Sequence, residues 1–462
     1  MSKADNNPTE QSPMHRVMGN FGFLVKGRGV AAVMLFAVAT LMARSLGPIE
    51  FGMVVLFQTY ALLIRGLVNF QVFDAIVRYG VPAHDNQDTS LLKQIIYVCW
   101  RVDLIASIVS TTIAVLLAPL IGPYLDMDSK HVFLLTAYSF VLIASTGNGT
   151  ARGVLRLFDK FGIIGKQMTI GPAVRFLGVV IAWWFDAPLS VFVAILAFGS
   201  VCEDLYLNWY GWREYKQGIA MKSGCTGDSE ETSEHNRQQN RMNNHKQAKL
   251  SNFPKMRHFL WVSYWQSNID LIPKHLSIIL AGSLLGSAAA GLLRLARQFS
   301  SLLSNPAVLI RQVVFLDLTR SWQQGSNAFK VITYRTALLG GAFGLLFVAA
   351  SYFFGAALLS TLVSDAFIAA APVLTLLLLA ATFDLVASPL RSACYAIGRA
   401  STVLRLYIFS ALIYLTTFVL FSTYLGLIGA GIAACAAAVL PPVAMFFIVK
   451  KTKNSVSVED II

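Results

Sequence analysis

Apolar runs of about 20 residues recur along the whole 462-residue chain and are separated by short polar turns. A bilayer core about 30 Å thick requires a helix of about 20 apolar residues. The runs lack the apolar and polar alternation of membrane barrel strands, and a helix satisfies its own backbone hydrogen bonds in lipid. The pattern therefore predicts an all-α integral membrane protein.

The runs predict about twelve transmembrane helices, six on each side of a hydrophilic stretch. The expected spans are residues 22–43, 51–77, 94–123, 131–151, 162–184, 187–210, 259–281, 288–316, 336–362, 366–390, 402–424 and 427–449. The expected parts are a polar tail (1–14), an N-terminal six-helix bundle (15–212), a basic, disordered cytoplasmic linker (213–257), a C-terminal six-helix bundle (258–449) and a cytoplasmic tail (450–462).

A short motif follows the first predicted span of each half. In residues 46–52 and again in residues 285–291, a Leu-Gly pair is followed five positions later by a second glycine. The two motifs are 239 residues apart. Arg152 and Arg391 are separated by the same number of residues, and each arginine follows an apolar run. In a glycine-rich chain the two glycine motifs could match by chance. The arginine pair at the same separation favours an internal repeat instead. We therefore expect two pseudo-symmetric bundles.

The composition supports a membrane protein and sets its orientation. Hydrophobic residues make up 56% of the chain and charged residues 13%, against roughly 25% charged in soluble domains. The net charge of +13 would suggest nucleic acid as a partner of a soluble chain. Here the basic residues gather at every second connection between spans, so we expect no nucleic-acid partner and assign these connections to the cytoplasmic side. Both termini are then cytoplasmic.

Motifs that would indicate an enzyme or a cofactor are not found. The five cysteines show neither CxxC nor Cys/His spacing, so we expect no metal site and no disulfide framework. The sequence has no GxxxxGK[ST] loop for ATP. The outer connections are too short to carry the catalytic loop of an external transferase or polymerase. We expect a protein that is not an enzyme and that needs no cofactor.

Several basic residues fall inside the predicted bilayer, where a charge costs at least about 2.5–3.5 kcal/mol on insertion scales. They lie at mid-depth or in the outer half of their spans. These residues are Arg65, Arg175, Lys274, Arg294 and Arg297. Arginine presents a planar fork of donors that matches phosphate oxygens. We expect the five side chains to face a shared water-filled cavity between the halves and to bind an anionic group.

The acidic residues inside the spans have two interpretations. Asp270 lies four residues before Lys274 on one helix face, so the two charges could neutralise each other. Pro273 between them removes a backbone hydrogen bond, and a hinge with a polar lining is the alternative. The candidates for coupling to H⁺ or Na⁺ are Asp270, Asp384, Glu203 and Asp204.

Two short motifs resemble those of a known family. The segment Arg44-Ser-Leu-Gly-Pro-Ile-Glu-Phe-Gly52 resembles the opening signature of the polysaccharide transporter family, the Wzx-type flippases of the multidrug/oligosaccharidyl-lipid/polysaccharide (MOP) exporter superfamily. The segment Cys394-Tyr-Ala-Ile-Gly-Arg399 is similar to a second pattern of that family. One departure is Asn69-Phe-Gln71, where relatives often have Asp and Gly, which leaves the subfamily and the cargo open.

The resemblance implies two six-helix bundles that form a V and open alternately to each side of a bacterial inner membrane. The implied cargo is a polyprenyl-pyrophosphate-linked oligosaccharide, carried from the inner to the outer leaflet for O-antigen or exopolysaccharide synthesis. Membrane lipid, H⁺ or Na⁺, and the polysaccharide polymerase and chain-length proteins are the other implied partners.

Three alternatives stay open at this point. An ion-coupled multidrug exporter of the same superfamily would require an acidic cavity, and only Asp270 and Asp384 lie deep enough. A peptidoglycan-precursor flippase usually has additional spans. A membrane-embedded polymerase or transferase would be expected to have a long outer loop.

Overall fold

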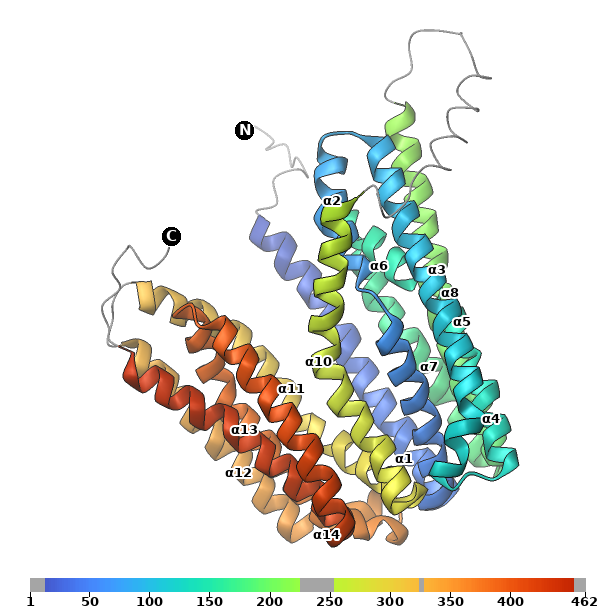
Figure 1. Ribbon diagram of the computed structural model, residues 1–462, viewed down its shortest axis with the longest axis vertical. Helices are drawn as coiled ribbons and strands as arrows, with labels where there is room; N and C mark the ends of the chain where they lie inside the picture. The colour runs from blue at the N-terminus through green and yellow to red at the C-terminus, as the bar shows by residue number, and fades with distance from the viewer. Residues whose placement is uncertain (1–12, 225–252, 324–327, 453–462) are drawn as a thin grey trace, which may run out of the picture. The chain divides into compact units, whose positions relative to one another are not determined.

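The computed structural model describes residues 13–224, 253–323 and 328–452, and every regular element in these ranges is a helix (Figure 1). The elements are α1 (Pro13–Val68), α2 (Val72–Asp85), α3 (Thr89–Ile121), η1 (Gly122–Leu125), α4 (Ser129–Ser139), α5 (Val141–Ala144), α6 (Asn148–Leu157), α7 (Phe161–Trp184), α8 (Leu189–Gly224), α10 (Pro254–Leu285), α11 (Ser287–Gln323), α12 (Ala328–Leu362), η3 (Asp365–Ala370), α13 (Ala371–Ala396) and α14 (Ala400–Lys451). The predicted all-α membrane architecture is confirmed.

Long apolar helices account for most of the described chain. Within the described ranges, seven helical stretches have the length and composition to cross a membrane. Helix α14 contains two predicted spans, and α1 contains one span and most of the next. The spans are joined at Gly426 (φ 60°) in α14 and at Gly47 (φ 70°) in α1, where the backbone leaves the helical region. Glycine tolerates these positive φ angles because it has no Cβ atom. The total of twelve spans stays a prediction.

Two of the predicted spans are interrupted. The span predicted at residues 51–77 is broken at residues 69–71, between α1 and α2. The span predicted at residues 131–151 is divided among α4, α5 and α6, with Gly147 at φ 79°. Both predictions of a continuous helix are wrong, because apolar content alone does not reveal a change of backbone direction. Irregular backbone at membrane depth is tolerated where it is buried in protein or lines a polar cavity.

Helix α8 extends further than the sequence predicts. Residues 213–224, which were expected to begin the disordered linker, continue the helix. Two contacts stabilise this extension: Glu214 lies 3.2 Å from the Lys160 ammonium group, and Tyr215 packs against a buried apolar cluster. Residues 254–257, at the other end of the predicted linker, are also helical and begin α10, whereas residues 225–252 lie outside the described residues.

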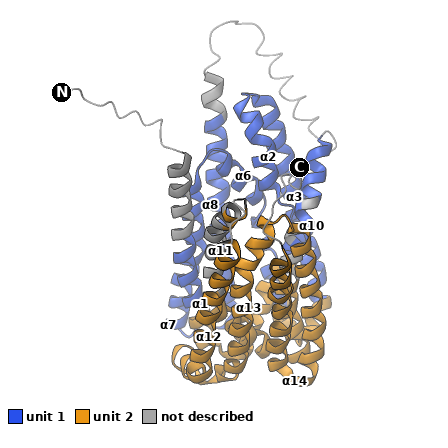
Figure 2. Ribbon diagram, turned by 90° about the vertical axis from the view of Figure 1, so that its left-hand side faces the viewer, with its two compact units in different colours: residues 1–38, 64–119, 133–268 blue, residues 39–63, 120–132, 269–462 orange. Residues whose placement is uncertain are grey.

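The chain divides into two compact units, coloured separately in Figure 2. Unit 1 comprises residues 1–38, 64–119 and 133–268, and unit 2 comprises residues 39–63, 120–132 and 269–462. Buried side chains of α2, α3, α6 and α10 form a core in unit 1, and those of α11, α12, α13 and α14 form a core in unit 2. The predicted bundle limits at 15–212 and 258–449 stay a prediction.

The glycines of the proposed repeat share an unusual backbone and meet within unit 2. Gly47 has φ 70° and Gly286, its counterpart, has φ 85°. The next pair, Gly52 and Gly291, are in contact: a Cβ atom on Gly291 would lie 3.0 Å from the Cα and N atoms of Gly52. Because only glycine permits this approach, the two halves of the repeat cross where they correspond.

Two further positions with a positive φ angle are also separated by 239 residues. Asp159 (φ 56°) lies just beyond α6, and Gly398 (φ 78°) lies just beyond α13. A left-handed residue is a common way to end a helix. Asp159 and Gly398 were not used to find the repeat in the sequence, so their shared backbone conformation supports it independently.

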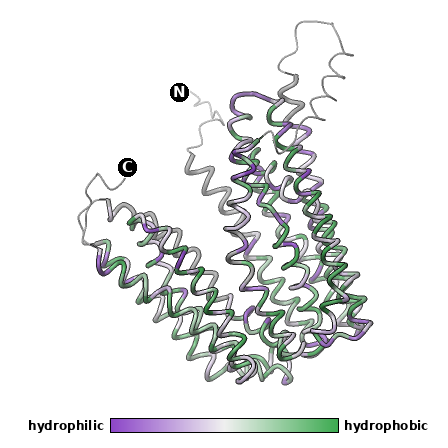
Figure 3. Tube along the Cα trace, viewed as in Figure 1, coloured by the Kyte–Doolittle hydropathy of each residue, from purple (hydrophilic) through white to green (hydrophobic). Residues whose placement is uncertain are grey.

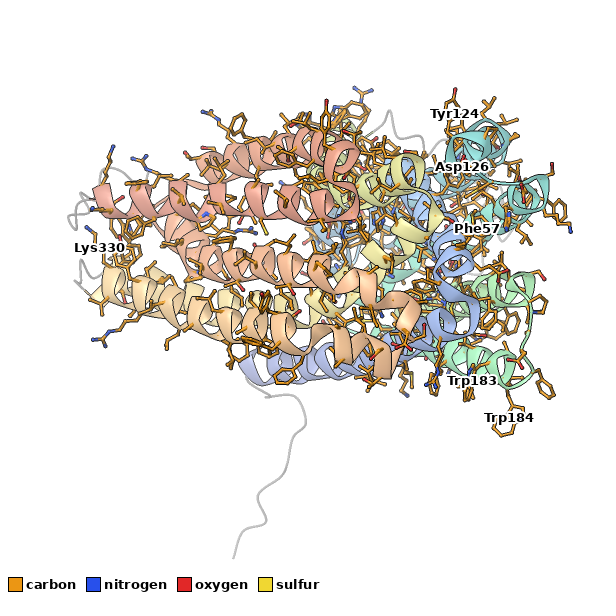
Figure 4. The ribbon with its side chains drawn as sticks, turned by 90° about the horizontal axis from the view of Figure 1, so that it is seen from below. Phe57, Tyr124, Asp126, Trp183, Trp184 and Lys330 are labelled. Atoms are coloured by element: carbon orange, nitrogen blue, oxygen red, sulfur yellow. The ribbon has the colours of Figure 1, made fainter. Side chains whose placement is uncertain are left out.

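Apolar and polar residues separate along the helices, as the hydropathy colouring of Figure 3 shows. Aromatic side chains gather at helix ends: Trp184 at the end of α7 is 75% exposed and Tyr124 in η1 is 77% exposed, and both project from the ribbon in Figure 4. Amphipathic rings favour the boundary between lipid and water. We therefore expect these side chains to serve as interfacial anchors.

Candidate functional site

A polar cavity of about 160 Å³ lies inside unit 1. It opens at the break between α1 and α2, where the last hydrogen bonds of α1 give way to a tight turn and the Val72 amide donates to the Phe70 carbonyl over 2.7 Å. The polar side chains that line it are Arg65, Asn69, Gln71, Asp103, Ser107, Ser110, Ser145, Asn148 and Arg152. The predicted cation Arg65 thus lies in a polar site that the interrupted helix creates.

Asp103 of α3 ties this cavity to the start of α6. Its carboxylate is buried and accepts hydrogen bonds from the Thr150 amide over 2.7 Å and from the Thr150 hydroxyl over 2.8 Å. The first amides of a helix have no partner inside the helix and favour a negative charge. Asp103 therefore caps α6 from a neighbouring helix, and the positive charge of Arg65 acts on it.

Asp204 of α8, a predicted coupling residue, is buried in a network of amide side chains. The Asn148 side-chain amide donates to the Asp204 carboxylate over 2.5 Å. Asn208 donates to the side-chain oxygen of Asn148 and to the Thr146 carbonyl, each over 3.0 Å. Since buried polar groups are costly when unpaired, this network fixes the broken α5–α6 junction against α8.

Glu203 and Arg175, both predicted site residues, contact each other. The Arg175 guanidinium lies 3.7 Å from the Glu203 carboxylate and donates to the Ser200 hydroxyl over 2.8 Å. The Gln167 side chain donates to the other carboxylate oxygen of Glu203 over 2.7 Å. Arg175 therefore has an acidic partner from α8, which reduces the positive charge that it can offer a ligand. Its role in substrate binding stays a prediction.

Charges of both signs are equally represented in these contacts of unit 1. The three cations are Arg65, Arg152 and Arg175, and the three anions are Asp103, Glu203 and Asp204. Asp103 was not among the predicted site residues, although an acidic residue inside the span predicted at 94–123 was a usable signal. Arg152 was predicted to mark the repeat and a cytoplasmic connection, not the site. This polar centre is close to neutral.

Unit 2 contains a centre of a different kind, which we call the cationic cluster: Lys274 of α10 with Arg294 and Arg297 of α11. The Arg297 guanidinium donates to the Lys274 carbonyl and to the Ser277 hydroxyl, each over 2.8 Å, and to the hydroxyl of Tyr414. The structure therefore brings together three of the five cations that the sequence predicted as substrate ligands.

The cationic cluster has no acidic partner among the side chains that the structure describes. None of its three charges lies within 4.0 Å of a described carboxylate. The side chain of Asp270 lies outside those described, so its predicted pairing with Lys274 stays a prediction. The three positive charges act on one another, which disfavours the cluster unless an anion approaches.

Asp384, the fourth candidate for ion coupling, takes no part in the hydrogen bonds of the cationic cluster. Its carboxylate is 3.8 Å from the guanidinium of Arg391 on the same helix, and its side chain is 53% exposed. Arg391 in turn stacks over the Tyr407 ring at 3.8 Å from the centroid. The repeat partners Arg152 and Arg391 thus both contribute to polar centres. A coupling role for Asp384 stays a prediction.

Within the described ranges, no three His, Cys, Asp or Glu side chains gather in a way that could hold a metal ion.

Comparison with known proteins identifies the family. The family described as "Polysaccharide biosynthesis protein" matches residues 17–315. The chain is also 26% identical over 350 residues to the inner membrane protein YghQ of Escherichia coli (strain K12), an alignment that covers 74% of this chain and 91% of that protein.

Two solved structures share the fold. One is the lipid II flippase MurJ in an inward closed conformation, with a TM-score of 0.69, 12% identity and coverage of 93% of this chain and 87% of that one. The other is a multidrug resistance MATE family transporter of the MOP superfamily in an inward-facing conformation, with a TM-score of 0.67, 14% identity and coverage of 92% and 96%. The chain belongs to the polysaccharide biosynthesis protein family and has the fold of these two transporters.

Proposed function

We propose that this protein is a flippase that moves a polyprenyl-pyrophosphate-linked oligosaccharide from the inner to the outer leaflet of the bacterial inner membrane. The observation that carries the proposal is the cationic cluster, three positive charges inside a membrane protein without an acidic partner among the described side chains. The family match supports a polysaccharide cargo.

The need for a polar path follows from the cost of dehydrating sugars. Burying one hydroxyl without a hydrogen bond costs roughly 4–8 kcal/mol on alkane scales, so about ten hydroxyls would meet a barrier of tens of kcal/mol. Polar and charged side chains along the path replace the lost water. The lipid chain needs no such path and stays in an apolar environment.

The sign of the charges distinguishes this function from export of cationic drugs. A cationic drug would require a free carboxylate, whereas Asp103, Glu203 and Asp204 already accept hydrogen bonds from protein donors. Arg294 makes no hydrogen bond or ion pair to another described residue, so its donors are available to pyrophosphate or acidic sugars. The cluster therefore favours an anionic cargo.

Ion coupling would reside in unit 1. Glu203 and Asp204 are adjacent carboxylates held by amide side chains, and protonation of either would change the charge of a nearly neutral network. A negative-inside potential of 100 mV adds about 2.3 kcal/mol per negative charge moved outward, so H⁺ or Na⁺ coupling would assist transport. We further propose that the chain catalyses no bond change and that polymerase and chain-length proteins act on its product.

The test is the distribution of lipid-linked oligosaccharide between leaflets in cells that carry charge variants. Arg294→Glu should abolish delivery to the outer leaflet while the protein level is unchanged, because a negative charge repels the cargo. Arg405→Glu is the control, since this exposed arginine of α14 lies outside the cluster. Normal delivery by Arg294→Glu would refute the proposal, and loss of glycan with an unchanged leaflet distribution would favour an enzyme.

A further inference from the structure

An apolar groove of about 630 Å³ runs along unit 1. Its walls come from the junction of α1 and α2, from α3 and from the first turns of α10. The apolar side chains that define it are Val68, Phe70, Ile105, Val109, Leu260 and Trp261. Arg257 and His258 also line it, so the groove has a basic contribution from the start of α10.

The groove is held in shape by contacts across its walls. The Tyr264 hydroxyl of α10 donates to the Leu67 carbonyl over 2.7 Å, and the Tyr264 and Phe70 rings lie 5.1 Å apart. These contacts join α10 to the end of α1 beside the interruption at residues 69–71. The groove is therefore a formed feature of unit 1 that does not depend on a ligand.

The groove adjoins the polar cavity of the same unit, because Phe70 and Ala106 line both. An apolar space next to a polar space fits a ligand with one end of each kind. The charged side chains that line the polar cavity are those of Arg65, Arg152 and Asp103. One oxygen of Asp103 is already occupied by Thr150, whereas the buried Nε of Arg152 has no hydrogen-bond partner in the described structure.

The two spaces differ in size as well as in polarity. The groove has a volume of about 630 Å³ and the polar cavity about 160 Å³. The groove therefore suits an extended apolar chain, and the polar cavity suits a small polar group.

We propose that the groove and the polar cavity together hold the lipid end of the cargo: a single prenyl chain in the groove, with the phosphate next to it between Arg65 and Arg152. This inference rests on the proposed function and adds a site in unit 1 to the cationic cluster of unit 2. Recognition of the chain and recognition of the glycan are thus assigned to different residues.

The first test uses the full-length wild-type protein in detergent and a photoreactive probe, geranylgeranyl pyrophosphate with a diazirine on its last isoprene unit. After illumination, peptide mass spectrometry should find adducts in residues 102–109 or 254–261. Excess inorganic pyrophosphate without a chain should reduce labelling less than excess unlabelled probe does. Adducts confined to other apolar surfaces, such as residues 338–354 of α12, would overturn the proposal.

The second test compares two exposed isoleucines of α3. Ile105 lines the groove and is 57% exposed, whereas Ile108 is 48% exposed and lies outside it. Ile105→Trp should fill the groove and weaken binding of radiolabelled geranylgeranyl pyrophosphate by about tenfold or more, while Ile108→Trp binds as the wild type does. Equal binding by the two variants would overturn the proposal, as would equal competition by phosphatidylglycerol and the unlabelled probe.

These binding measurements separate the inference from the proposed function. If both isoleucine variants bind the probe equally but Arg294→Glu blocks delivery of the glycan, only the assignment of the groove fails. If Ile105→Trp loses the probe and Arg294→Glu still delivers the glycan, the groove stands and the role of the cationic cluster fails.

Discussion

The contact between Gly52 and α11 allows a prediction that compares two glycines of the same helix. A Cβ atom at Gly52 would overlap the Ser287 carbonyl and lie 3.2 Å from the Ala288 amide nitrogen. Both obstacles are backbone atoms, so no side-chain rotation can relieve them. At Gly29, by contrast, a Cβ atom would meet nothing within 4 Å.

The expected energies follow from these surroundings. An alanine in a helix is more stable than a glycine by roughly 0.5–1 kcal/mol, so Gly29→Ala should stabilise the protein by about that amount. Gly52→Ala gains the same term but adds an overpacking cost of about 1–3 kcal/mol. The variants should therefore differ by about 1–3 kcal/mol, with Gly52→Ala less stable than Gly29→Ala.

The assay is thermal unfolding in detergent, followed by tryptophan fluorescence, with both variants at equal protein concentration. Gly291→Ala should also destabilise the protein, because it enters the same contact from the other helix. The double variant of Gly52 and Gly291 should lose less than the sum of the single losses, since the first substitution already separates the helices. Equal melting temperatures for Gly52→Ala and Gly29→Ala would refute the proposed crossing of the repeats.

Three further predictions concern the polar centres. Asp103→Ala should leave both Thr150 donors unpaired and cost about 1–3 kcal/mol, measured as a lower melting temperature, whereas Asp103→Asn keeps a carbonyl acceptor and should lose less; equal losses would contradict the capping role. Tyr414→Phe removes a hydrogen-bond partner of Arg297 and should cost about 0.6–2 kcal/mol, a loss that should disappear when Arg297 is already glutamine; purely additive losses would speak against the contact. Arg391→Lys should lower the free energy of unfolding by about 0.5–2 kcal/mol, because a lysine lacks the planar guanidinium that stacks on the Tyr407 ring. An unchanged free energy of unfolding in chemical denaturation would disprove that stacking.

The helical membrane fold could be predicted from the sequence because hydrocarbon imposes long apolar helices. The interruptions could not be predicted from apolar content. Gly147 lies among small polar residues, and residues 69–71 carry two amide side chains. The apolar residues on either side are numerous enough that both stretches fall within predicted spans. The repeat was visible because the close approach of Gly52 and Gly291 requires glycine at both positions.

The candidate site was predictable in part. Charges inside spans can be recognised one by one, which identified Arg65, Arg294 and Arg297. Their partners come from distant parts of the chain, as with Arg297 and Tyr414 or Arg175 and Glu203, and no spacing rule connects them. The sequence therefore indicated where charges lie, but only the fold shows which of them have an acidic partner among the described side chains.

The central claim is that the cationic cluster serves the movement of an anionic lipid-linked glycan. The most direct measurement follows a labelled polyprenyl-pyrophosphate oligosaccharide in proteoliposomes and records how fast it becomes accessible from the opposite side. The account predicts rapid exposure with the wild-type protein and exposure close to that of protein-free vesicles with Arg294→Gln combined with Arg297→Gln. Equal rates for the wild-type protein and the double variant would contradict it.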